Sequence, residues 1–122
     1  MKLHIAQTAA NLVTSYGEGY VTVLQNRYEN SLIVLPDEVI ADWPPENFEA
    51  LKPEHLAVLV ARNPEIVLLG TGNKLRFPRP EVMRPLIETG RGYEVMDLPA
   101  ACRTYNILVA EGRRVAAALI MD

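Results

Sequence analysis

"DLPAACRTYNILVAEGRRVAAALI", residues 97–120, holds a helix and a buried strand in immediate succession and decides the fold class. Asp97 is suited to cap the helix, Pro99 fits its first turn and Gly112 fits its end. Apolar residues recur along this helix at the spacing i, i+3, i+4 and i+7, namely Leu98, Ala101, Cys102, Tyr105, Leu108 and Val109. "VAAALIM" (115–121) is apolar throughout, which is typical of a strand covered on both faces.

The same alternation of strand and helix extends back along the chain. "NSLIVLP" (30–36), "EIVLLG" (65–70) and "YEVMD" (93–97) are short apolar runs that predict strands. Apolar stripes at helical spacing predict helices over residues 53–63 and 80–90. This order of elements, from residue 31 onward, predicts an α/β fold with right-handed crossovers.

The N-terminal third has the pattern of strands and tight turns. Two strands, 11–16 and 20–25, flank the glycine-rich turn 17–19, which predicts a β-hairpin. We expect this hairpin to join the sheet and make it mixed, and we expect residues 37–53 to be loop-like. Pro85 should bend the second helix or limit its first part to a turn. The prediction is one α/β domain over residues 1–122, with a mixed sheet, an N-terminal hairpin and about three helices on the sheet.

Composition limits the kind of protein. Apolar residues make up 49% and charged residues 22% of 122 residues, as in ordinary globular domains. A net charge of −3 argues against nucleic acid as the main partner, because such binding depends on cations that neutralise phosphates. The single cysteine excludes an intrachain disulfide and suits a reducing compartment. We find no signal peptide and no apolar run of the length of a membrane span, so we expect a cytoplasmic protein.

A glycine turn, Gly70-Thr71-Gly72, directly follows the strand 65–70. Ligands of open α/β sheets bind beyond the carboxyl ends of the strands, and glycines let backbone N–H groups approach an anion. However, Leu75 stands where a dinucleotide-binding loop has its third glycine, and the spacing of a Walker loop is absent. The turn therefore predicts at most a site for a small anion.

A basic segment on an acidic chain follows the turn. Residues 74–91 contain five positive and two negative side chains, whereas residues 1–66 contain four positive and nine negative. The positive residues are Lys74, Arg76, Arg79, Arg84 and Arg91. Such a segment suits the acidic surface of a partner protein or a small anion, although a solvated surface with ordinary arginines is the simpler explanation.

Few residues are candidates for catalysis. Cys102 lies on an apolar helix stripe and should be a buried, inert thiol. His4 and His55 are far apart and lack further ligands at metal spacing, so we expect no metal and no cofactor. Asp97, Thr104 and Asn106 could line a pocket, but a helix cap and local hydrogen bonds account for them. We therefore assign no catalytic residue.

Several segments of the chain carry a family resemblance. "IVLLGTG" and "MDLPAACRTYNILVAEGRRVAAALI", preceded by "YGEGYVTV" and "NSLIVLP", resemble a family of small bacterial and archaeal proteins of unknown function. Eukaryotic relatives of that family include a mitochondrial assembly factor for respiratory complex I. The resemblance implies a single α/β domain with a mixed sheet and carries over no active site. Because we find no transit peptide, we expect the chain to belong to the bacterial branch.

Two functional hypotheses follow. The first is a non-enzymatic protein-interaction module that assists assembly of a respiratory, complex I-like membrane complex, with the basic segment against an acidic partner surface. The second is a small-molecule (anion) binding protein or enzyme, with a pocket between the turn Gly70–Gly72 and the start of the Asp97 helix. Thr71, Asp97 and Asn106 would point into that pocket.

Overall fold

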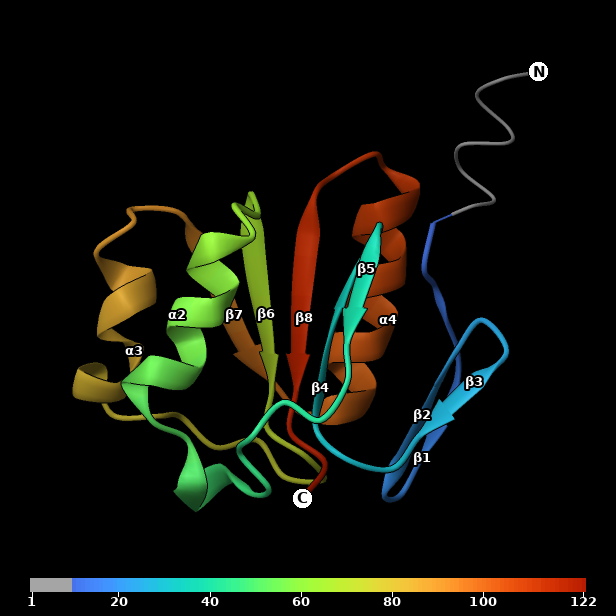
Figure 1. Ribbon diagram of the computed structural model, residues 1–122, viewed down its shortest axis with the longest axis horizontal. Helices are drawn as coiled ribbons and strands as arrows, with labels where there is room; N and C mark the ends of the chain where they lie inside the picture. Colours follow the sequence, from blue (N-terminus) through green and yellow to red (C-terminus); the bar gives the residue numbers. More distant parts are fainter. Residues whose placement is uncertain (1–9) are drawn as a thin grey trace.

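The computed structural model describes residues 10–122, which form two β-sheets and three α-helices (Figure 1). The larger sheet has the strand order β5-β4-β8-β6-β7. Its strands are β4 (Leu32–Leu35), β5 (Glu38–Ile40), β6 (Ile66–Gly70), β7 (Gly92–Met96) and β8 (Val115–Leu119). β6 is parallel to β7 and β8, whereas β4 is antiparallel to β8 and β5. The predicted α/β class with a mixed sheet is confirmed.

The N-terminal hairpin forms a sheet of its own, so the expectation that it makes the main sheet mixed is wrong. β1 (Val13–Gly17), β2 (Tyr20–Val23) and β3 (Asn26–Tyr28) pair antiparallel in that order. A second tight turn at Leu24, where φ is +54°, ends β2 early and returns the chain as β3. Each strand therefore pairs with its neighbour in sequence, and the mixed character of the main sheet comes from β4 and β5 instead.

Residues 37–53 also differ from the expected loop. Pro36 and Asp37 form a two-residue turn, because Leu35 pairs with Glu38 at the start of β5. A short 3-10 helix, η1 (Phe48–Ala50), follows. Because β5 reverses the chain direction after β4, it lies parallel to β6, and the segment between β5 and β6 becomes the crossover.

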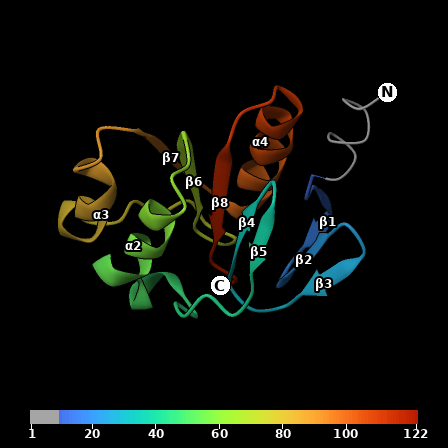
Figure 2. The same cartoon turned by 45° about the horizontal axis from the view of Figure 1, so that its top comes forward.

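Three helices cover the two faces of the main sheet (Figures 1 and 2). α2 (Pro53–Ala61) and α3 (Pro80–Ile87) lie on one face, and α4 (Leu98–Ala110) with the small sheet lies on the other. α3 continues through Pro85, so this proline does not reduce the first part of the helix to a turn. At the sixth helical position it removes a single i to i−4 hydrogen bond, and the rest of the short helix remains.

The alternation of side chains along the strands divides the core into two halves. Leu68 of β6 faces α4 and the small sheet, whereas Val67 and Leu69 face α2 and α3. All four residues of β4 and all five of β8 are buried, as the sequence predicts. β6 and β8 end at the same edge of the sheet, the lower edge in Figure 1, together with the chain end and η1. We call this the carboxyl edge.

Candidate interaction surface

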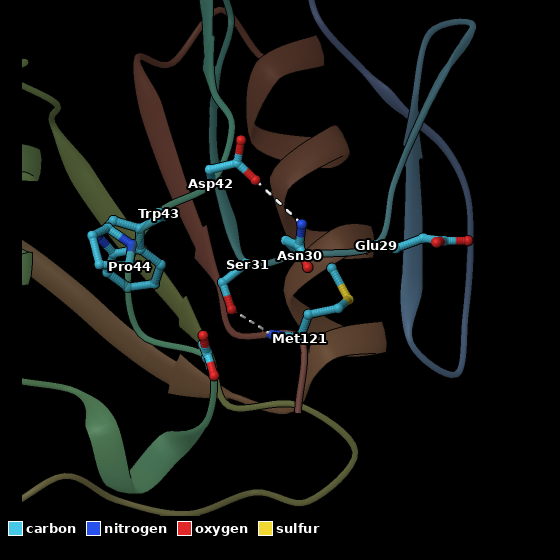
Figure 3. A pocket seen from close by; sticks show the side chains of 8 residues that line it. Glu29, Asn30, Ser31, Asp42, Trp43, Pro44 and Met121 are labelled. Carbon is cyan, nitrogen blue, oxygen red and sulfur yellow. Dashed lines mark hydrogen bonds between the residues drawn. The ribbon is translucent and has the colours of Figure 1, made fainter.

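An open hollow of about 490 Å³ lies at the carboxyl edge (Figure 3). Its lining comes from three separate parts of the chain: Glu29, Asn30, Ser31, Asp42, Trp43, Pro44, Glu46 and Met121. Asn30 Nδ2 donates to Asp42 Oδ1 at 3.2 Å across the hollow. Ser31 is buried, and its Oγ accepts the backbone N–H of Met121 at 2.9 Å. We call this feature the acidic hollow.

The charge of the acidic hollow is negative. Glu29, Asp42 and Glu46 line it, and no lysine or arginine does. Within residues 10–122, no group of three or more histidine, cysteine, aspartate or glutamate side chains is arranged to hold a metal ion. His4 lies outside the described residues. The indole N–H of Trp43 is engaged, because it donates to the carbonyl of His55 at 3.1 Å. Sequence reasoning missed this hollow, since its residues share no spacing that signals a site.

The glycine turn at the same edge is closed by contacts within the protein. Thr71 is buried; its N–H donates to Met96 O at 2.9 Å and its Oγ1 donates to Lys74 O at 2.5 Å. A Cβ on Gly72 would lie 2.9 Å from the Cβ of Asp122, so the chain end packs directly on the turn. These contacts occupy donor groups that an anion would need, and anion binding at the turn stays a prediction without a supporting contact.

The turn and the start of α4 do meet, through the backbone. Leu98 N–H donates to Gly72 O at 2.8 Å, directly after the helix cap. Asp97 is that cap, and its Oδ1 accepts the N–H of Ala100 at 2.9 Å. The two segments that the sequence predicts to converge are therefore in contact, and helix capping accounts for the carboxylate of Asp97.

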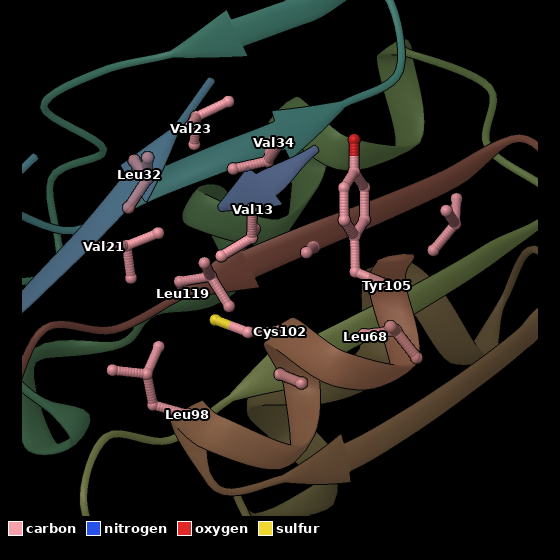
Figure 4. Packing of buried hydrophobic residues seen from close by; sticks show 13 residues of the cluster. Val13, Val21, Val23, Leu32, Val34, Leu68, Leu98, Cys102, Tyr105 and Leu119 are labelled. Carbon is pink, nitrogen blue, oxygen red and sulfur yellow. The ribbon is translucent and has the colours of Figure 1, made fainter. Parts of the chain in front are cut away.

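Asn106 lies on another part of α4 and holds the small sheet. Its Oδ1 accepts the N–H of Val13 at 2.9 Å, and its Nδ2 donates to the carbonyl of Val13 at 2.7 Å. The neighbouring Tyr105 donates its hydroxyl to Asn11 O at 2.7 Å (Figure 4). At 1.5 Å per residue, Asn106 is about 13 Å along the helix from Asp97. The half-buried Thr104 is two residues before it. The structure thus separates Asn106 from the glycine turn.

Cys102 is fully buried between α4 and the sheet, close to Leu119 and Leu98 (Figure 4). Burial raises the pKa of its thiol to about 12, and nearby Arg103 opposes this shift. A thiol that stays protonated and covered is a poor nucleophile. The predicted burial is confirmed.

Arg76, in the middle of the basic segment, faces the protein. Its backbone N–H donates to Thr71 Oγ1 at 3.2 Å, and its Nη2 donates to Thr71 O at 3.1 Å. Its Nη1 donates to Glu49 Oε2 at 3.3 Å, and Nη2 also pairs with the Asp122 carboxylate. The guanidinium carbon is 4.8 Å from the centre of the Phe48 ring. This one side chain joins the turn, η1 and the chain end.

With Arg76 turned inward, its neighbours along the extended segment face solvent. Leu75 is 51% exposed and Phe77 is 71% exposed, whereas Arg76 and Pro78 are half-buried. Successive side chains of an extended chain point to opposite sides, which explains this alternation. Two large apolar side chains are therefore presented together on the surface.

A groove of about 310 Å³ lies beside Phe77, between η1 and the start of α3. Its lining is Phe48, Glu49, Leu51, Phe77, Pro78, Arg79 and Val82. We call it the docking groove. Apart from Glu49 and Arg79 its lining side chains are apolar, which is typical of the core of a protein interface.

Some cations of the basic segment are bonded to other parts of the protein, and others are exposed to solvent. Arg76 is ion-paired, and Arg91 Nη1 donates to Pro64 O at 3.3 Å. Lys74, Arg79 and Arg84 are exposed. The exposed cations Lys74 and Arg79 bracket the two apolar side chains.

The family can be identified from the sequence in these elements. The family described as "Protein of unknown function (DUF498/DUF598)" matches residues 13–120, from β1 through the end of β8. The chain belongs to this family. The match confirms the resemblance that the glycine turn and the α4–β8 stretch carry.

The chain is similar to named proteins and to a protein of known structure. A "13 kDa major membrane protein" of Francisella tularensis subsp. holarctica (strain LVS) is 32% identical over 106 residues, which cover 86% of each chain. NADH dehydrogenase (ubiquinone) 1 alpha subcomplex assembly factor 3 of Mus musculus is 34% identical over 110 residues. That match covers 88% of this chain but only 59% of the mouse protein. A crystal structure of a protein from Bordetella parapertussis has 44% identity and a TM-score of 0.84, covering 93% of this chain and 98% of the other.

None of the helices formed by residues 10–122 has both the length and the apolar character to cross a bilayer.

Proposed function

We propose that this chain is a non-enzymatic protein-interaction module that assists assembly of a respiratory, complex I-like membrane complex. In this role it binds a partner protein through Leu75, Phe77 and the docking groove. The observation that carries the proposal is the exposure of Phe77, with Leu75 beside it and a groove of about 310 Å³ next to it. Large exposed apolar side chains rimmed by charges are typical of protein interaction sites.

The way in which the surface is built supports the same role. Arg76 anchors the backbone of the segment through Thr71, Glu49 and Asp122, so Leu75 and Phe77 project toward solvent on the opposite side. A preformed surface loses less conformational entropy on binding than one that must be ordered by its partner.

The relatives support the choice of process. One of them is named as an assembly factor for a subcomplex of NADH dehydrogenase and another as a major membrane protein. In the proposed role the chain reaches a membrane complex from the cytoplasmic side by binding one of its subunits. On this account the chain is a peripheral factor that holds a subunit during assembly.

Affinity capture from the source cells, at native abundance, tests the proposal. We expect the wild-type protein to recover a defined partner, and we expect Phe77→Ser to lose most of it. Ile107→Ser is the matched control, because Ile107 is 58% exposed but lies on α4, away from the docking groove. Recovery of no partner by any of the three proteins would refute the proposed function.

A further inference from the structure

We infer that the docking groove takes one bulky apolar side chain of a partner protein, carried on a segment rich in aspartate and glutamate. This inference rests on the proposed function and specifies the chemistry of the partner.

The size and lining of the groove favour a single apolar side chain. At about 310 Å³ it is at the lower end of the range of about 300–1,000 Å³ that ligand pockets occupy. Phe48 and Leu51 form one wall, and Phe77, Pro78 and Val82 form the other. An aromatic or leucine side chain entering between them would bury apolar surface on both sides, as anchor residues of interfaces do.

The two walls are held at a fixed separation by Arg76. Its guanidinium stacks on Phe48 at 4.8 Å and pairs with Glu49, while its backbone is bonded to Thr71. Because Arg76 connects the two walls within the protein itself, the groove is already formed before a partner binds. The partner then only has to insert a side chain into it.

The charges around the groove select an acidic segment. Glu49, the one carboxylate in the lining, pairs with Arg76, which it shares with Asp122. Arg79 has no ion pair within residues 10–122 and adds an uncompensated positive charge to the lining. Lys74 is exposed at the other end of the apolar pair. Glu81 lines a different hollow, on the other side of α3 with Arg84. The acidic hollow would repel the same segment, so the charge of the molecule directs it to the docking groove.

A bilayer with anionic lipids is the main competing occupant, since apolar and basic side chains also bind membrane surfaces. The concave shape of the groove favours a protruding side chain, because a flat bilayer cannot enter it.

The test uses a fluorescein-labelled peptide with a central phenylalanine and only aspartate and glutamate elsewhere. One control peptide replaces the phenylalanine by serine, and a second replaces the acidic residues by lysine. Fluorescence anisotropy at low salt should show binding of the first peptide alone. Phe77→Ser and Arg79→Glu should each weaken that binding about tenfold or more, equivalent to about 1.4 kcal/mol, whereas Ile107→Ser should not. Added salt should weaken it as well.

Three outcomes would overturn the inference. The first is equal binding of the phenylalanine and serine peptides, and the second is binding that Phe77→Ser leaves unchanged. The third is Phe77-dependent sedimentation with phosphatidylglycerol vesicles while no peptide binds, which would make the surface a membrane contact. If affinity capture from cells recovers the same partner with wild-type protein and with Phe77→Ser, the inference fails, but a protein-interaction function remains. Thermal unfolding of each variant checks that the fold is intact.

Discussion

The guanidinium of Arg76 donates to Glu49, to Asp122 and to the carbonyl of Thr71 at the same time. The pairing is specific to a planar group that can donate in several directions at once. Arg76 therefore stabilises the carboxyl edge, and the cations left for a partner are Lys74, Arg79 and Arg84.

Replacing Arg76 by alanine should destabilise the protein. The variant loses two ion pairs and a hydrogen bond to a buried turn, so we expect the free energy of unfolding to fall by about 1–3 kcal/mol. Urea denaturation measures the change. Arg79→Ala is the control, because an exposed cation without a pair should change stability by less than about 0.5 kcal/mol. Equal effects of the two substitutions would contradict the assigned role of Arg76.

Asp122 should make part of this stability depend on pH. The hydrogen bond from Arg76 holds the pKa of the Asp122 carboxyl below its ordinary value of 3.8; burial opposes the shift, and the Phe48 N–H adds to it. Because the folded state favours the ionised form, the stabilisation is present above pH 3.8 and is lost as the pH falls through the folded pKa. NMR titration of the Asp122 carboxyl carbon should show the lowered pKa, and Arg76→Ala should return it toward the ordinary value. An unchanged pKa in Arg76→Ala would assign the shift to another group.

Asn106 should be required for attachment of β1. Asn106→Ala leaves both the N–H and the carbonyl of Val13 without their partner, at a cost of about 1–3 kcal/mol. Hydrogen exchange should show lost protection at the amide of Val13, with the amides of β6 much less affected. Asn106→Asp keeps an acceptor but loses the donor, so we expect it to be about as harmful. Unchanged protection at Val13 in both variants would contradict the pairing.

At the scale of elements, Gly70 allows α4 to lie close to β6 and β8. A Cβ at position 70 would be 3.0 Å from Leu119 Cδ2 and 3.1 Å from the Cβ of Ala101. The Ala101 contact is the rigid one, because its Cβ is fixed to the helix. We therefore expect Gly70→Ala to destabilise the protein by about 1–3 kcal/mol in thermal or urea unfolding. Gly92→Ala is the control, since its nearest neighbour would be Ile66 at 3.8 Å, an ordinary contact. A neutral Gly70→Ala would show that α4 can move away freely.

The long elements of this fold are readable from the sequence, whereas the short ones are not. α4 carries a complete periodic pattern, and β8 and β4 are uninterrupted apolar runs. β3 and β5 have three residues each, too few for a period, and their places depend on pairing with a neighbour. The separation of the small sheet from the main sheet could not be predicted either. The sequence indicates that a hairpin forms, but it does not indicate whether the hairpin pairs with other strands.

The candidate site was only partly readable for a similar reason. The basic segment and the glycine turn are local features of the sequence. The turn lies at the carboxyl edge, as predicted from the end of β6, whereas the basic segment extends from there through α3 to Arg91. The inward turn of Arg76 depends on Glu49 and Asp122, which are 27 and 46 residues away in sequence. The docking groove and the acidic hollow are likewise assembled from distant segments.

At the scale of the whole molecule, the reactivity of the Cys102 thiol measures how often α4 separates from the main sheet. It is buried between α4 and the main sheet, and its pKa is raised to about 12 by burial. We expect iodoacetamide to leave it unmodified in the native protein and to react readily once urea has unfolded the chain. The native rate should follow the opening free energy as urea rises. Fast modification without denaturant would contradict the packing of α4.

The carboxyl edge presents two surfaces of different character. The acidic hollow lies around Glu29, Asp42 and Glu46, and the docking groove lies beside Phe77 and the exposed cations. An asymmetric charge distribution of this kind orients an incoming partner before contact. For the acidic partner segment that we infer, this charge distribution gives a preferred direction of approach.

Site-specific photo-cross-linking at position 77 tests the central claim most directly. A benzoylphenylalanine placed at position 77, and in a separate protein at position 107, is irradiated in the source cells at native abundance. The account predicts a defined cross-linked partner from position 77 and none of it from position 107. A partner that cross-links equally from both positions, or from position 107 alone, would show that Phe77 and the docking groove are not the surface by which this protein acts.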